Sequence, residues 1–168
     1  EYDEDGTDEL RISGNTVFVN SVDHTLDAHF DSSPADETVS GITATFTAGE
    51  DLSRGEVVYY KPSDSKMWKA VATAIATSRC VAMAAEDIDI SSSATGKFLL
   101  KGFLQDNGTF PAYTAGDVLY TPEAETSSQN VPEAAAPDTD GDFVQIIGWA
   151  VDANTVYFNP DSTVIEVA

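Results

Sequence analysis

Two histidines and three nearby aspartates form the first group of residues whose types suit chemistry. His24 and His29 stand five residues apart, with Asp23, Asp27 and Asp31 beside them. Paired metal ligands on one helix face are four residues apart, so this spacing does not match. We therefore predict an exposed polar segment; the alternative is a cation site formed across a symmetry axis of an oligomer.

Two acidic runs resemble the first half of a calcium loop. Residues 138–142 have the sequence Asp-Thr-Asp-Gly-Asp, and residues 3–8 have a similar composition. A complete loop needs a glutamate about eleven residues after its first ligand, and Trp149 stands there in the first run. We predict acidic turns and assign no metal site, while weak Ca²⁺ binding through clustered carboxylates stays open.

The residue sets required for catalysis are missing from the sequence. Cys80, the single cysteine, lies in an apolar run and is expected to be a small buried hydrophobe. Neither Gly-x-Ser-x-Gly nor a phosphate-binding loop occurs. Paired carboxylates carry no information in so acidic a chain. We predict a non-enzymatic protein without catalytic or cofactor-binding residues; a carboxylate-dependent hydrolase is the least supported alternative.

Aromatic side chains are the remaining candidates for ligand binding. In strands they usually fill the core, which is the prediction here, and the alternative is a platform on which sugars stack. The residues concerned are Tyr59, Tyr60, Trp68, Tyr113, Tyr120, Trp149 and Tyr157.

Short β-type segments that could position these residues recur along the chain. Alternating β-branched and aromatic residues between Gly, Pro and Asn turns favour an all-β fold, an antiparallel β-barrel or sandwich. One short helix is expected at 70–77, and Asn107-Gly108 is predicted to form a hairpin turn. The predicted strands are 42–47, 56–61, 66–70, 79–85, 96–104, 117–120, 143–151, 155–158 and 164–167.

Two regions of different character divide the chain. Residues 1–40 are polar and acidic, and they are predicted to form an extended N-terminal arm with a short strand pair near residues 10–19. Residues 41–168 form the predicted β-domain. Within it, Gly55 and Gly116 each precede an acid and an apolar strand, and apolar runs follow at 80–84 and 146–150. This similarity predicts a weak internal duplication.

The charge balance is strongly acidic. The 168 residues include 8 Lys and Arg against 29 Asp and Glu, for a net charge of -21. Such a chain lacks the cations that bind nucleic acid or anionic membranes, so neither is an expected partner. The charge fits adaptation to salty water, where it is screened; docking onto a basic surface is the alternative.

Three segments in fixed order resemble a family of phage proteins. Residues 41–70 contain Leu-Ser-x-Gly-Glu-Val-Val-Tyr-Tyr and Lys-x-Trp-Lys-Ala, and residues 70–88 are alanine-rich and lead to Arg-Cys-Val-Ala-Met-Ala. Residues 114–159 contain Ala-Gly-Asp-Val-Leu-Tyr and later Thr-Val-Tyr-Phe-Asn. Over residues 41–160 the chain is similar to β-rich structural proteins of tailed bacteriophages, of the tail-fibre, head-fibre or capsid-decoration kind.

The resemblance implies a non-catalytic virion protein that decorates or stabilises the particle as a symmetric oligomer, often a homotrimer. Its expected partners are other virion proteins, such as the major capsid or a tail protein, and its expected location is the particle surface. The arm at residues 1–40 is a candidate anchoring or oligomerisation segment. The alternative function is an extracellular module that binds a cell-surface glycan or receptor.

Overall fold

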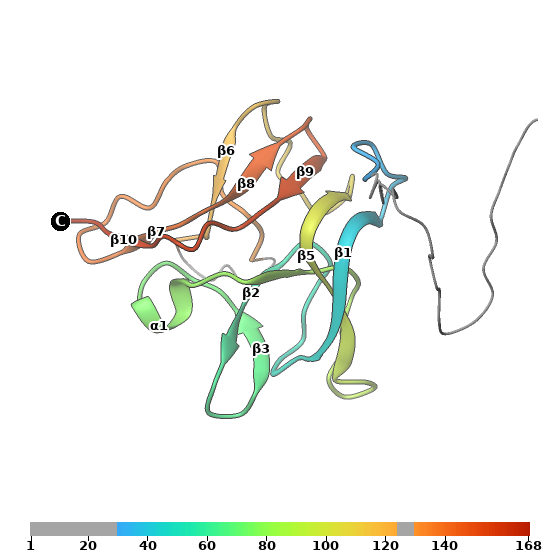
Figure 1. Cartoon of the computed structure of the whole chain (residues 1–168), viewed down its shortest axis with the longest axis horizontal. Coiled ribbons are helices and arrows are strands. Elements are labelled where there is room, and N and C mark those ends of the chain that lie inside the picture. Colours follow the sequence, from blue (N-terminus) through green and yellow to red (C-terminus); the bar gives the residue numbers. More distant parts are fainter. Residues whose placement is uncertain (1–29, 124–129) are drawn as a thin grey trace, which may run out of the picture.

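Antiparallel strands make up most of the molecule. The computed structural model describes residues 30–123 and 130–168. Its strands are β1 Thr38–Thr47, β2 Val57–Lys61, β3 Lys66–Lys69, β4 Ala82–Ala84, β5 Thr95–Gln105, β6 Val118–Tyr120, β7 Phe143–Val144, β8 Ile146–Ala150, β9 Thr155–Phe158 and β10 Ile165–Glu166. The main sheet has the order β3-β2-β4-β5-β9-β8-β6 with β1 paired to β5, and β10 pairs with β7. The sheet curls strongly into a half-barrel (Figure 1), which confirms the all-β prediction.

The helix is shorter than the sequence predicts. It covers only α1, Ile75–Ser78, instead of 70–77. The amide of Ala70 donates to Val57 O at 2.9 Å, and the amide of Ala72 donates to Pro122 O at 2.8 Å. A helix over 70–77 would also need the carbonyls of Ala70 and Ala72 as acceptors. These carbonyls instead accept from Asn130 Nδ2 at 2.6 Å and from Phe143 N at 2.9 Å, so the alanine-rich stretch does not become helical before Ile75.

Two predicted strand boundaries also change. Residues 143–151 are divided into β7 and β8 at Gln145, whose side-chain amide accepts from Cys80 N at 2.7 Å and donates to Cys80 O at 3.0 Å. At the other end, β1 begins at Thr38, inside the range predicted to be the arm. The strand pair predicted near residues 10–19 lies outside the described residues.

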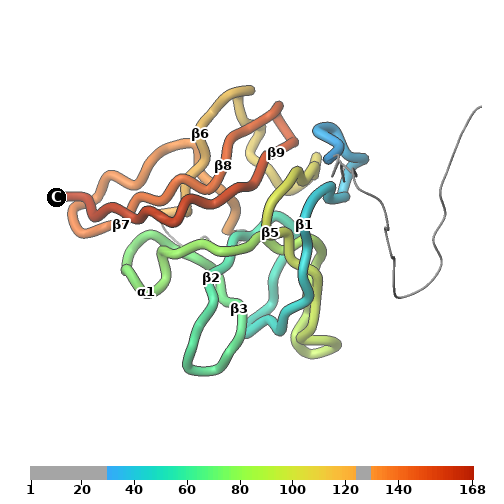
Figure 2. The backbone as a smooth tube through the Cα atoms, viewed as in Figure 1, coloured from blue at the N-terminus to red at the C-terminus, as the bar shows by residue number. Residues whose placement is uncertain are grey.

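Strand β5 is the centre of the sheet. It pairs with β1 along its whole length, so β4 and then β9 share its other edge. The tube in Figure 2 follows this long β1–β5 ladder. An extra residue, Leu100, interrupts the register and forms a bulge that increases the local bend. Gly41 and Gly102 then face each other.

Two hydrophobic cores lie on opposite faces of β2, β4 and β5. Successive side chains of a strand point to opposite faces, and Val57 and Leu99 therefore enter one core while Val58 and Phe98 enter the other. The first core lies inside the half-barrel and includes residues of β6, β8 and β9. The second is covered by the end of β1, by β3 and by the segments around Leu52 and Ile88.

The same hydrogen-bond pattern occurs twice in the chain. Gly55 N donates to Ala84 O at 2.9 Å, and Gly116 N donates to Ala150 O at 2.8 Å. Ala84 N bonds Glu56 O at 2.8 Å, as Ala150 N bonds Asp117 O at 2.9 Å. Gly55 and Gly116 both have positive φ, 85° and 92°. We call residues 53–105 the first repeat and residues 114–158 the second repeat.

The acid of each repeat caps the same turn. The Glu56 carboxylate accepts the amide of Ser53 at 2.9 Å, and the Asp117 carboxylate accepts the amide of Thr114 at 2.9 Å. The strand that follows pairs antiparallel with β4 in the first repeat and with β8 in the second. Sequence similarity and backbone bonding therefore agree on which residues correspond.

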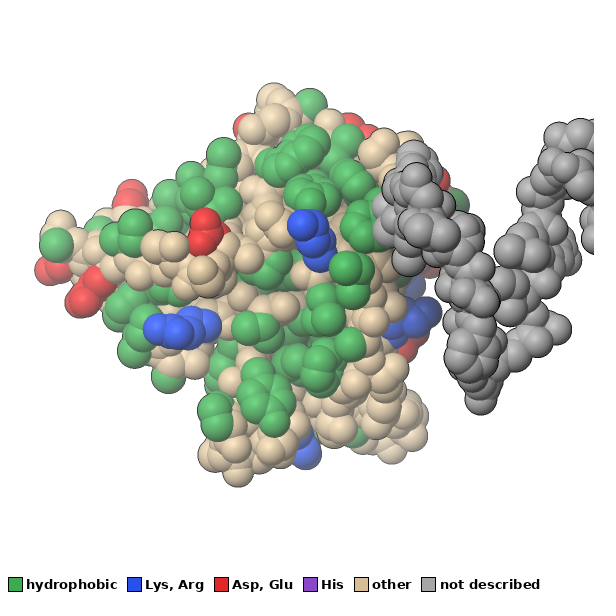
Figure 3. Space-filling view, in the orientation of Figure 1, with side chains coloured by type: hydrophobic (Ala, Val, Ile, Leu, Met, Phe, Trp, Pro, Cys, Tyr) green, Lys and Arg blue, Asp and Glu red, His purple; other side chains and the backbone are tan. Residues whose placement is uncertain are grey.

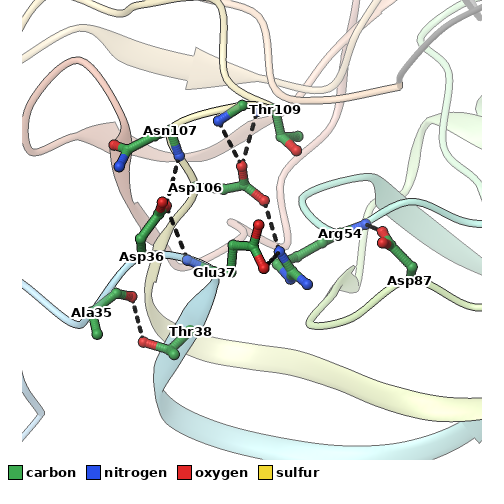
Figure 4. A network of polar contacts seen from close by, with 10 residues as sticks. Ala35, Asp36, Glu37, Thr38, Arg54, Asp87, Asp106, Asn107 and Thr109 are labelled. Atoms are coloured by element: carbon green, nitrogen blue, oxygen red, sulfur yellow. Dashed lines mark hydrogen bonds and ion pairs between the residues drawn. The ribbon is translucent and has the colours of Figure 1, made fainter.

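Asp106 fastens the segment before β1 to the rest of the sheet (Figure 4). Its carboxylate lies 3.1 Å from the Arg54 guanidinium, which also lies 3.3 Å from Glu37. The other Asp106 oxygen accepts the amides of Gly108 and Thr109, both at 2.9 Å. One buried acid thus joins the end of β5, the turn before β2 and the start of β1.

The turn predicted at Asn107-Gly108 is present, but the hairpin is wrong. Strand β5 pairs with β1, β4 and β9, whereas β6 pairs with β8. Asp106 closes the turn locally, and Phe110 then enters the first core. This directs the chain away from the edge of β5.

Candidate functional site

A row of apolar side chains crosses the outer face of the half-barrel, a face that no element of residues 30–123 and 130–168 covers. Val118 pairs with Trp149, Trp149 with Tyr157, and Tyr157 with Phe103. The Trp149 and Tyr157 ring centroids are 5.7 Å apart, and those of Tyr157 and Phe103 are 4.9 Å apart. We call these four residues the outer row.

Strand alternation places the outer row opposite the inner core. Its neighbours along the strands, Leu119, Ala150 and Val156, are buried in the first core, so the row must face outward. Trp149 is 44% exposed and Val118 is 40% exposed. Ile146 lies opposite Tyr120. Its side chain is 46% exposed and adds to the apolar surface.

This face lacks the acids that dominate the chain. Strands β6, β8 and β9 and residues 102–105 of β5 contain no Asp or Glu. In Figure 3, hydrophobic side chains gather over β8 and β9, and the acidic side chains of this view lie mostly toward the end that carries the C-terminus. Depletion of charge combined with aromatic enrichment characterises the centre of a protein interface.

The aromatic residues divide between core and surface. Tyr113 is buried, as predicted, and Trp68 packs over Gly49 with Lys61 Nζ 4.2 Å from its ring centroid. The prediction of a core position is wrong for Tyr60 and Trp149, which are exposed. Tyr59, Tyr120 and Tyr157 are partly buried. Sequence alternation alone does not reveal that, among the described residues, nothing covers the strand face carrying Trp149.

Two carboxyl groups, Glu123 and Asp142, lie within hydrogen-bonding reach of each other. Asp142 is only 6% exposed, and its Oδ2 accepts no hydrogen bond from a described donor. Burial raises the pKa of Asp142, and the adjacent Glu123 carboxylate raises it further. The pKa of Glu123 is lowered by the hydrogen bond that it accepts from Thr139 Oγ1 at 2.6 Å and by its contact with Asp142. Asp142 therefore holds a shared proton more readily than its partner does.

The turn at residues 138–142 ties this pair to the C-terminal strands. Asp142 N donates to Thr139 O at 3.0 Å, while Gly141 N donates to Val167 O at 2.9 Å. Asp138 and Asp140 point into solvent. In the described part of the chain, three or more metal-ligating side chains do not gather at any point.

Cys80 belongs to the first core, as the sequence predicts. It is buried, and this burial raises the pKa of the thiol to about 12. A thiol must ionise to act as a nucleophile, so at neutral pH Cys80 is a packing residue.

A shallow groove of about 440 Å³ lies between the segments 111–114 and 131–135. Three ionisable side chains line it, and each is already engaged. Asp117 accepts the amide of Thr114, Glu133 accepts the amide of Glu123 at 3.2 Å, and the Tyr113 hydroxyl donates to Pro132 O at 2.5 Å. Burial also raises the pKa of Tyr113. The lining is therefore largely apolar, and each of its two carboxylates also holds a backbone amide.

The histidine group and the acidic run at residues 3–8 fall outside the described residues. Of the group's members, Asp31 is described: its amide donates to Ser40 Oγ at 2.7 Å and its carboxylate accepts from Ser33 N at 2.9 Å. Within residues 30–123 and 130–168, no helix has the length and hydropathy needed to span a membrane. Comparison with protein-family models, curated proteins and solved structures finds no match to this chain.

Proposed function

We propose that this protein is a non-enzymatic structural component of a tailed-phage virion, a capsid-decoration or fibre protein that works through symmetric self-assembly. The outer row is the observation that carries the proposal. It presents neighbouring apolar side chains on strands that contain no Asp or Glu. Exposed apolar surface of this kind marks a contact surface.

The chemistry of the described residues supports a role that does not involve catalysis. The thiol of Cys80 is buried and protonated, and the carboxylates in the groove beside Tyr113 serve to hold backbone amides. The virion context of the proposal rests on the resemblance of residues 41–160 to structural proteins of tailed phages. A particle surface also suits the high negative charge, because self-repulsion keeps unassembled chains soluble.

Light scattering on the full chain tests the self-assembly. We expect a trimer at micromolar concentration, which dissociates only on further dilution. A monomer at every concentration would contradict symmetric self-assembly.

Glycan binding is the second candidate, favoured by the half-exposed Trp149 ring beside Tyr157. Aromatic faces stack on sugars, so a bound oligosaccharide should shift the tryptophan emission. Titration of the full chain with neutral oligosaccharides, repeated with Trp149→Ala, measures this. A saturable shift that Trp149→Ala removes would favour the binding module over the assembly protein.

A further inference from the structure

Most residues of the outer row have equivalents in the first repeat. Gly55 and Gly116 make equivalent hydrogen bonds in the two repeats, and so do Ala84 and Ala150. These matches align the strands of one repeat with those of the other, residue by residue. The aligned strand pairs have the same register, Val57 with Met83 in one and Val118 with Trp149 in the other. The next strand over then brings Leu99 and Tyr157 into equivalent places.

In the first repeat this face is buried. Val57, Met83 and Leu99 have no exposed surface. The side chains that share their core include Leu119, Ile147 and Phe158, all from the second repeat. The second repeat is therefore the cover of the first.

In the second repeat the same face is uncovered, because a single chain contains no further repeat in its described residues to cover it. From this we infer that the outer row packs against a second copy of this chain, which supplies the missing cover. The inference deepens the proposed function and rests on it, since it assigns the self-assembly contact to Val118, Trp149, Tyr157 and Phe103.

Electrostatics permits this contact on an otherwise repulsive molecule. Two chains of charge -21 repel each other wherever acids are brought together. The strands that carry the outer row contain no Asp or Glu, as is true of every strand of the main sheet, so contact through the row itself brings no strand carboxylates together. Buried aromatic residues also contribute most to binding at interface centres.

The variant Trp149→Glu tests the assignment, with Tyr60→Glu as its matched control. Both replace an aromatic residue of nearly equal exposure, 44% and 43%, by the same charged residue, and Tyr60 lies on β2, away from the outer row. We expect Trp149→Glu to raise the dissociation constant of the oligomer at least about 100-fold, as measured by light scattering and sedimentation. Tyr60→Glu should assemble like the original chain.

The outcomes separate the two proposals. An oligomer that both variants leave intact would overturn the assignment of the face while self-assembly stands. A wild-type chain that is monomeric overturns both. Loss of assembly in both variants would also overturn the assignment, because the added negative charge, and not its position on the outer row, would then be the cause.

The glutamate variant could fail to assemble because it misfolds, so a second measurement leaves the outer row unchanged. In Trp68→Phe, Trp149 is the remaining tryptophan. Its quenching by acrylamide, a neutral quencher, should fall several-fold as concentration is raised through assembly. Quenching that stays constant while the mass rises would place the contact elsewhere.

Discussion

Glu56 joins three segments that are distant in sequence. The residue is 1% exposed, and its Oε1 lies 3.2 Å from Lys69 Nζ and accepts the amide of Asn130 at 2.8 Å. Oε2 caps the turn at Ser53. Asn130 in turn donates from Nδ2 to Ala70 O at 2.6 Å. Because every partner is a cation or an N–H donor, the site requires a carboxylate.

Replacing Glu56 by Gln should destabilise the fold by about 3 kcal/mol, because Lys69 would lose its buried partner and one oxygen would be replaced by a donor. Urea denaturation at pH 7 measures the loss. Glu166→Gln, on exposed β10, is the control and should change the free energy of unfolding by less than about 0.5 kcal/mol. Equal effects of the two variants would refute this role for Glu56.

Because the pKa of Asp142 is raised on folding, its effect on stability changes with pH in the direction opposite to that of a carboxyl whose pKa is lowered on folding. A folded-state pKa raised above the unfolded value of about 3.9 stabilises the fold below that value, and the contribution is lost as pH rises through the raised pKa. Glu123, whose pKa is lowered, contributes above its unfolded value and loses that contribution as pH falls. As the pH rises through the raised pKa of Asp142, the pair becomes two adjacent carboxylates.

Asp142→Asn should raise the urea midpoint at pH 7, since an amide can donate to Glu123 without charge. The gain should shrink as the pH is lowered through the raised pKa of Asp142, where the original chain regains its proton. Asp140→Asn in the same turn is exposed and serves as the control. A gain independent of pH, or one equally large in the control, would show that general charge reduction is responsible.

At the scale of elements, the pairing of β1 with β5 depends on two facing glycines. A Cβ on Gly41 would lie 2.3 Å from Lys101 O and 2.8 Å from Gly102 Cα. Gly102 itself has φ +141°, a conformation that favours glycine. The two strands can follow each other through the bulge at Leu100 because neither residue has a side chain.

We expect Gly41→Ala to destabilise the chain by at least about 3 kcal/mol or to prevent folding, because backbone rather than a movable side chain occupies the space. Gly108→Ala is the matched control, since its Cβ would meet nothing closer than 3.6 Å; it should cost less than about 1 kcal/mol. Thermal unfolding followed by circular dichroism compares the two. A tolerated Gly41→Ala would mean that β1 can shift away from β5.

The elements show how far sequence patterns reach. Alternation predicted most of the strands, because it reflects burial on one face of each strand. It could not predict the split at Gln145 or the late start of α1, since both depend on hydrogen bonds to Cys80, Asn130 and Phe143 across long sequence distances. Alternation also could not predict the outer row. A strand pattern shows which side chains share a face but not whether another part of the chain covers that face.

At the scale of the whole molecule, charge opposes assembly. With 29 acids and 8 bases, two copies repel over a screening length of about 10 Å at 0.1 M salt and about 3 Å at 1 M. The outer row supplies apolar attraction that salt does not weaken. Assembly should therefore respond to salt in the direction opposite to that of an ion-pair interface.

Raising NaCl from about 0.05 M to about 0.5 M should lower the dissociation constant of the oligomer, as the screening length falls. Sedimentation velocity at several concentrations measures this. The same salt series on Lys101→Gln checks the single cation beside the row. Weaker association at high salt, abolished in Lys101→Gln, would instead indicate an interface held by that lysine.

The split edge of β5 has a consequence for biosynthesis. As the chain leaves the ribosome, β1 through β5 are complete while the half-edge at residues 102–105 still waits for β9, which begins at Thr155. Until then unpaired backbone groups lie beside Phe103, which is the kind of open strand edge that recruits other chains. A nascent or truncated chain that ends before β9 should need a chaperone more than the finished protein does, and Lys101 stands where a charged gatekeeper residue would limit that hazard.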